Sequence, residues 1–152
     1  AAGQPSVIEF NCRFGDPETQ PVMMRMQSDL AKLCLAALDG DLINHVLEFD
    51  DQVALTVVMA AGGYPDKYAS GDDITGIDAA DALGKVFHAG TRLEDGKVVT
   101  NGGRVLGVTA TGQSVLEAQQ RAYAMVEKIQ FAKAQYRTDI GYRAIAREQD
   151  AN

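Results

Sequence analysis

The chain has 152 residues, 46% of them apolar and 23% charged, and its 21 acidic and 14 basic side chains give a formal net charge of −7. Such a length and composition predict one ordinary globular domain that buries roughly 70% of its unfolded surface. The negative charge disfavours nucleic acid and anionic lipid as partners, and no run of about 18 apolar residues predicts a membrane span. Any anionic substrate would therefore be met by local cations such as Arg13, Lys85 or Arg104.

The first predicted element is a strand over residues 6–13, in which apolar and polar residues alternate. Successive side chains of a strand point to opposite faces, so the polar residues Glu9, Asn11 and Arg13 would share one face, with Glu9 and Asn11 about 7 Å apart. The other face is apolar and suits a core. Its members are Ile8, Phe10 and Cys12.

The polar face of this strand places a carboxylate, an amide oxygen and a guanidinium in a row. Hard cations such as Mg²⁺ take oxygen ligands and keep phosphates as partners, and arginine binds phosphate through its fork of N–H groups. Such a row could hold Mg-nucleotide phosphates. An ordinary amphipathic strand with a solvated face explains the same alternation. The turn-forming residues 14–20 that follow favour a site, because sites are commonly built at strand ends.

Two helices are predicted next, a single turn over residues 22–26 and a longer helix over residues 30–38. In the longer helix, apolar residues recur at i, i+3, i+4, i+7 and i+8, and Gly40 supplies the stop. This helix would cover one face of the sheet. Residues 39–51 are acidic and lose the apolar period, so we expect the boundary between two modules there.

The second module is predicted to be a small antiparallel sheet with a packed helix. The apolar, β-branched run at residues 53–61 predicts a strand buried on both faces. A long connection follows over residues 64–84, with one short strand near Ile74. A hairpin turn is expected at residues 94–97. Three further strands are expected, at residues 85–91, 98–100 and 104–110.

The strongest helix signal in the chain begins at Ser114. Ser114 and Glu117 have the spacing of a capping box, and the apolar residues that line one face as far as Ile129 predict a helix packed in the core. The tail is expected to add a short final helix that carries Arg143 and Arg147.

A candidate anion site lies in the turn Asn101-Gly102-Gly103-Arg104. Small residues free backbone N–H groups, and an arginine directly after them can close an anion nest with its guanidinium. A hairpin turn with an exposed arginine is the alternative interpretation.

The cysteines and histidines of the chain show no spacing that is typical of a metal site. Cys12 and Cys34 lack any metal-ligand spacing and predict buried free thiols in a reducing compartment. Neither His45 nor His88 has a spaced partner that would suggest a metal.

The segment from Glu9 to Gln20 resembles the signature segment of the glycinamide ribonucleotide synthetase (phosphoribosylamine-glycine ligase) family of ATP-grasp enzymes. The resemblance continues in order and spacing along nearly the whole chain. Its further blocks are residues 28–30, 58–65, 85–91, 100–106 and 139–143.

This resemblance implies an α+β chain in two parts. Residues 1–50 would be the C-terminal remnant of the ATP-grasp domain, with the metal-binding strand and a helix, and residues 51–152 a small, mainly antiparallel α+β domain. The family's enzyme is much longer, and its preceding domains hold the nucleotide lid and most of the adenine pocket. We therefore expect this chain, which opens without methionine, to be a fragment or a split subunit that needs the missing N-terminal part.

The resemblance also implies a cytoplasmic reaction of purine biosynthesis. Glycine, ATP and 5-phosphoribosylamine give glycinamide ribonucleotide, ADP and phosphate through a glycyl phosphate. Glu9 and Asn11 match the family's ligands for Mg²⁺ or Mn²⁺ and so bind the metal of ATP. Arg13 matches the arginine expected to act in catalysis and to face the phosphate or acyl phosphate. Asp16 and Glu18 belong to the signature loop, in a supporting role.

The substrate's ribose phosphate is implied to bind in the second module. Related ATP-grasp ligases of purine synthesis use a basic site in the equivalent small domain. The implied substrate-binding residues are Arg13, Asp16, Gly102, Gly103 and Arg104.

Two other functions fit the same residues. Another ATP-grasp ligase with a different amine or carboxylate would share the metal pair without the long signature, and substrate profiling would separate the two. A noncatalytic binding or assembly module is the second alternative, since this chain has no nucleotide lid. Retained binding of a ribose phosphate without ATP turnover, even with the upstream part supplied, would favour it.

Overall fold

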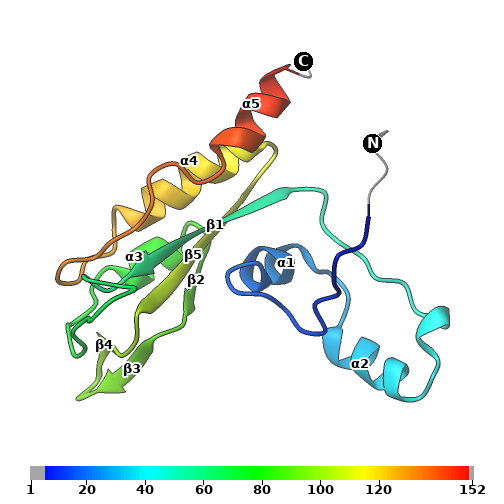
Figure 1. Ribbon diagram of the computed structural model, residues 1–152, viewed down its shortest axis with the longest axis horizontal. Coiled ribbons are helices and arrows are strands. Elements are labelled where there is room, and N and C mark those ends of the chain that lie inside the picture. Colours follow the sequence, from blue (N-terminus) through cyan, green and yellow to red (C-terminus); the bar gives the residue numbers. More distant parts are fainter. Residues whose placement is uncertain (1–5, 151–152) are drawn as a thin grey trace.

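The computed structural model describes residues 6–150 (Figure 1). It has a mixed α/β architecture in which helices and strands run in the order α1 (Thr19–Arg25), α2 (Leu30–Leu38), the 3-10 helix η1 (Leu42–Asn44), β1 (Val53–Ala60), α3 (Ile77–Asp81), β2 (Lys85–His88), β3 (Thr91–Glu94), β4 (Lys97–Thr100), β5 (Arg104–Gly112), α4 (Val115–Val126) and α5 (Tyr142–Asp150). The expected α+β class is confirmed.

The main sheet has three antiparallel strands in the order β1-β5-β2, so β5 lies in the centre. Val57 of β1 and Val86 of β2 both lie opposite Val108 of β5. The strands β3 and β4 form a separate two-stranded hairpin, closed by Asp95 and Gly96 with positive φ angles. The predicted turn at residues 94–97 is therefore confirmed.

The core lies between this sheet and α4. Alternate residues of β1, namely Leu55, Val57 and Met59, are buried, as the period of a strand requires. The opposing face of α4 contributes its apolar stripe to the same core. The buried residues of that stripe are Ala118, Ala122, Met125 and Val126.

The second face of the sheet is covered less completely. The short helix α1 packs on β1 and β5, on the side opposite α4 (Figure 1). The β1 residues on that side are only half-buried. The prediction that this strand is buried on both faces is therefore wrong for one face, because α1 has seven residues and covers only part of it.

Helices α4 and α2 are each capped at the N-terminus by a side chain. The Ser114 side chain accepts a hydrogen bond from the Glu117 N–H at 3.1 Å, and the Glu117 carboxylate accepts one from the Gln113 N–H. Asp29 caps α2 by accepting bonds from the N–H groups of Ala31 and Lys32. Each cap satisfies amide donors that the first helical turn leaves without partners.

The strand predicted over residues 6–13 is wrong in this structure. The segment forms no strand, and its apolar side chains Val7, Ile8 and Phe10 are 73%, 96% and 81% exposed. A strand is stabilised by hydrogen bonds to a neighbouring strand, and none of the described strands pairs with these residues. Alternation can indicate a strand but cannot supply its partner.

The connection between β1 and β2 also differs from expectation. It contains the helix α3, which the sequence did not indicate, and near Ile74 there are only isolated bridges. The predicted strand over residues 85–91 ends at His88, and Thr91 begins the β3–β4 hairpin. Gly90 lies between them against Gly102, a backbone contact that leaves no room for a side chain.

A substitution at Gly76, the residue before α3, tests how tightly the connection between β1 and β2 is packed. Its φ is +80°, and an added Cβ would collide with the Lys128 carbonyl. We expect Gly76→Ala to lower the free energy of unfolding by about 3 kcal/mol, as left-handed strain and backbone overlap combine. Gly71→Ala is the control, because Gly71 also has positive φ but open space around it, and should lose only about 1 kcal/mol. Equal losses in urea denaturation would contradict the packing argument.

Asp81 fixes the start of β2. Its carboxylate accepts a hydrogen bond from the Val86 N–H at 2.7 Å, and this bond, together with the Lys85 ammonium, holds the pKa of Asp81 below its usual value of 3.8. A lowered pKa stabilises the fold above the unfolded-state value, and the stabilisation is lost as pH falls through the folded-state value.

We therefore expect Asp81→Asn to cost about 1 kcal/mol at neutral pH, a modest figure because the carboxylate is partly exposed. The difference from the unmodified chain should shrink below about pH 4, as Asp81 itself becomes protonated. Denaturation curves across this pH range measure it. Asp78→Asn, which removes an exposed carboxylate from the same helix, is the matched control.

Candidate functional site

The three residues of the predicted metal strand lie in the exposed segment before α1. Among the described residues, Glu9 and Asn11 have no hydrogen-bond or ion-pair partner, and Arg13 donates only a long bond of 3.4 Å to the Phe14 carbonyl. Asn11 and Arg13 line an open hollow of about 450 Å³. No group of three or more acidic, histidine or cysteine side chains in residues 6–150 could hold a metal.

The signature loop after this segment is closed by its own side chains. The Gly15 N–H donates to the Glu18 carboxylate at 2.9 Å, and the Thr19 hydroxyl donates to the Gly15 carbonyl at 2.5 Å. Gly15 is buried, and a side chain there would overlap Glu18. Glu18 therefore shapes the loop.

Asp16 of the same loop contacts the second module. Its Oδ2 lies 3.0 Å from Nη2 of Arg104, the first residue of β5, and both side chains are about half exposed. Two residues that the resemblance assigned to substrate binding are thus brought together from the two parts of the chain. The ion pair fixes the direction of the Arg104 guanidinium.

The glycines before Arg104 allow close packing. A side chain on Gly103 would overlap the Tyr64 ring, and one on Gly102 would meet the backbone of Gly90. The Gly103 carbonyl also accepts a hydrogen bond from the Ala61 N–H at 2.8 Å. These contacts explain both glycines without a ligand, so the anion nest stays a prediction that depends on Arg104.

Arg104 lines a pocket of about 330 Å³ together with a second arginine, Arg137, and the aromatic rings of Tyr64 and Tyr136. Arg137 was not predicted, because it lies in the loop between α4 and α5, outside any periodic element. It makes a two-pronged ion pair with Asp139, at 2.9 and 2.7 Å. This pair raises the pKa of Arg137 and lowers that of Asp139, chiefly through the hydrogen bonds.

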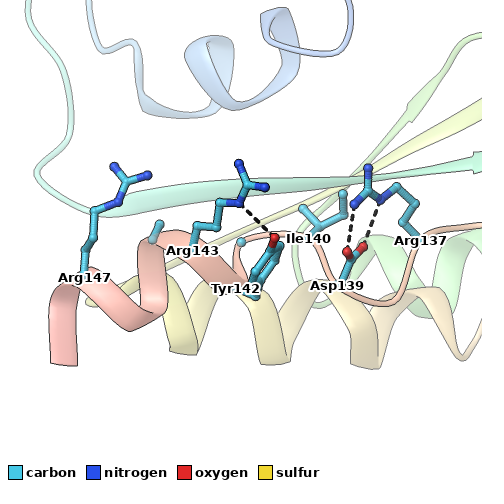
Figure 2. Close-up of a pocket in the computed structure, with 8 residues that line it drawn as sticks. Arg137, Asp139, Ile140, Tyr142, Arg143 and Arg147 are labelled. Carbon is cyan, nitrogen blue, oxygen red and sulfur yellow. Dashed lines mark hydrogen bonds and ion pairs between the residues drawn. The ribbon is translucent and has the colours of Figure 1, made fainter. Parts of the chain in front are cut away.

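A second pocket, of about 400 Å³, is also lined by Arg137 (Figure 2). Its lining includes Arg143 and Arg147 of α5, which the sequence placed in a final helix without assigning them a role. Their spacing of four residues was the available signal, since it places two side chains on one helical face.

The residues 6–50 leave an apolar surface uncovered. Only Gly15 and Ala36 are buried there. Both cysteines, Cys12 and Cys34, are free and exposed, so the prediction of buried thiols is wrong. An apolar hollow of about 380 Å³ lies between α1, α2 and the residues after η1. Its lining includes Val22, Met26, Leu30, Leu33, Cys34, Leu47 and Phe49.

Comparison with known proteins gives the family. The family described as "Phosphoribosylglycinamide synthetase, C domain" matches residues 54–143, more than half of the chain. The chain belongs to this family. Its matched region runs from β1 to the beginning of α5 and includes Arg104, Arg137 and Arg143.

Two relatives are similar in sequence to this chain over almost the full length of the chain. The phosphoribosylamine–glycine ligase of Pasteurella multocida is 57% identical over 148 residues, which are 97% of this chain and 34% of the relative. That of Escherichia coli K12 is 59% identical over 150 residues, 97% of this chain and 35% of the relative. The chain therefore spans about a third of the length of these relatives.

A solved structure extends the likeness to three dimensions. The crystal structure of phosphoribosylamine–glycine ligase from Thermotoga maritima superposes with a TM-score of 0.78 at 38% sequence identity. The match covers 91% of this chain and 34% of that one. In residues 6–150, no helix has the length and apolar character needed to cross a membrane.

Proposed function

We propose that this chain supplies the metal-binding segment and the C-terminal domain of a phosphoribosylamine-glycine ligase that acts in the cytoplasm. The observation that carries the proposal is the 57–59% identity to enzymes of that name along 97% of the chain. In the proposed reaction, a carboxylate oxygen of glycine attacks the γ-phosphorus of ATP and ADP leaves. The amine of 5-phosphoribosylamine then attacks the acyl carbon of glycyl phosphate, and phosphate and a proton leave.

The chain's own part in the first step is charge neutralisation. Glu9 and Asn11 offer oxygen donors that suit Mg²⁺ or Mn²⁺, and neither has a competing partner among the described residues. An ion held by Glu9 and Asn11 would offset the charge that develops on the transferred phosphoryl group. Arg13, whose guanidinium makes only one long bond, is free to turn toward the acyl phosphate.

The second substrate requires a phosphate site. Arg104 and Arg137 line one pocket, whereas the chain as a whole has a net charge of −7. This pocket is therefore a favourable place for the ribose phosphate. Asp16 supports the site by orienting Arg104 through the 3.0 Å ion pair. Gly102 and Gly103 bring the turn close to Tyr64 at the edge of the same pocket.

The two parts of the chain would have different roles. Residues 51–152 carry nearly all of the described core and form the small C-terminal domain, whereas residues 1–50 are the end of the catalytic domain. The exposed apolar surface of residues 6–50 supports this division, because so large a surface is normally covered. Its partner would be the polypeptide that corresponds to the remaining two thirds of the relatives.

Reconstitution tests the proposal directly. The chain is mixed with the upstream part of the Escherichia coli relative, and glycine-dependent ADP release is followed with 5-phosphoribosylamine generated in the assay. We expect release only in the combined sample. Glu9→Gln should reduce the combined turnover about 100-fold or more, since it removes a metal ligand and leaves the fold unchanged. Glu48→Gln, which removes an exposed carboxylate from the same part of the chain, is the control. Near-normal turnover of Glu9→Gln would remove Glu9 from the metal site.

Arg104 gives a second, independent test in the reconstituted enzyme. We expect Arg104→Ala to raise KM for 5-phosphoribosylamine about tenfold or more, because a charge-assisted contact to the phosphate is lost, while KM for ATP stays nearly constant. Arg92→Ala is the matched control, since Arg92 lies in the β3–β4 hairpin and is paired with Glu94. Equal effects on both substrates would point to a folding defect and contradict a role in substrate binding.

A further inference from the structure

The loop after α4 and the beginning of α5 form a basic pocket. Figure 2 shows Arg137, Arg143 and Arg147 with their guanidinium groups on the same side of α5. The pocket of about 400 Å³ is lined by these three arginines and one acidic residue, Asp139. A local charge of +2 stands out in a chain whose net charge is −7.

The single acid of this pocket is already used. Both Asp139 oxygens accept hydrogen bonds from Arg137, at 2.9 and 2.7 Å, so these two residues neutralise one another. This ion pair keeps the pKa of Asp139 below its usual range. The charge of Arg143 also lowers the pKa of Asp139, but neither Arg143 nor Arg147 forms an ion pair with this carboxylate.

The two α5 arginines keep most of their donors free. Arg143 donates its Nε–H to the Tyr142 hydroxyl at 2.8 Å, and its two terminal nitrogens have no acceptor in residues 6–150. Arg147 makes no hydrogen bond or ion pair within the same residues, not even with Asp150 one turn later. The neighbouring Glu148 directs its carboxylate to the Val115 N–H at the start of α4.

We propose that Arg143 and Arg147 form a binding site for a phosphate monoester, separate from the pocket of Arg104. Two guanidinium forks one helical turn apart match a dianion with three acceptor oxygens better than a carboxylate with two. The Tyr142 hydroxyl, which accepts from Arg143, keeps its own proton for a further bond to the ligand. The inference depends only on the geometry of α5, so it does not require the proposed ligase function.

The site can be tested on the chain as it stands. Inorganic phosphate is titrated while the arginine side-chain and α5 backbone signals are followed by NMR. We expect saturable shifts centred on α5, an affinity about tenfold lower in Arg143→Gln or Arg147→Gln, and a larger loss in the double variant. Glutamine keeps the helix propensity, and circular dichroism verifies the α5 helix.

The controls separate this site from general charge effects. Arg121→Gln removes one positive charge from α4, where Arg121 is already paired with Glu117 at 2.6 Å, and should leave phosphate affinity unchanged. Arg104→Ala should leave the α5 shifts in place. A loss in Arg121→Gln equal to that in Arg143→Gln, or disappearance of the α5 shifts in Arg104→Ala, would overturn the proposal. So would the absence of saturable α5 shifts.

The same titration identifies the kind of phosphate monoester. Ribose 5-phosphate and AMP are compared with inorganic phosphate on the unmodified chain and on the double variant. Tighter binding of ribose 5-phosphate that depends on both arginines supports a sugar-phosphate site, and tighter binding of AMP supports a nucleotide site. Either ligand binding equally well to the double variant would contradict the assignment.

Discussion

The antiparallel pairing of β5 with both β1 and β2 is the interaction on which the rest of the structure depends. As the central strand, β5 gives one face to α4 and the other to α1, so nearly all of its residues are buried. Its first residue, Arg104, is the exposed exception. The buried strand therefore holds the charged side chain of Arg104 at a fixed position on the surface. There the signature loop contacts the C-terminal domain through Asp16.

Helix α1 packs on β1 and β5, and polar contacts add to this junction between residues 6–50 and residues 51–150. The Arg25 guanidinium donates two hydrogen bonds to the Asp50 carbonyl, at 3.1 and 2.9 Å, and the Asp16–Arg104 ion pair is half exposed. Exposed polar contacts of this kind contribute little free energy compared with the burial of an apolar core. Nearly all of the described core accordingly lies in residues 51–150, while residues 6–50 present an exposed apolar surface.

Sequence patterns predicted the elements whose signals are local. The capping box at Ser114 and the stripe that follows gave α4, and the β-branched run gave β1, because the residues that decide these elements are neighbours in the chain. The strand at residues 6–13 failed because pairing requires a partner that periodicity cannot reveal. The helix α3 is only five residues long, too short for a period. The two pockets that Arg137 lines were not predicted, because each combines the loop between α4 and α5 with residues from other parts of the chain. The resemblance nevertheless identified the family correctly.

The two exposed thiols offer a way to measure whether the surface of residues 6–50 is covered. Cys12 and Cys34 both lie in residues 6–50, one in the segment before α1 and the other on α2 beside the apolar hollow, and residues 51–152 contain no cysteine. A thiol-reactive fluorophore would therefore label only residues 6–50, which carry the exposed apolar surface, without any engineered residue. The rate of labelling reports whether that surface is open or covered, and so measures association even when no catalysis occurs.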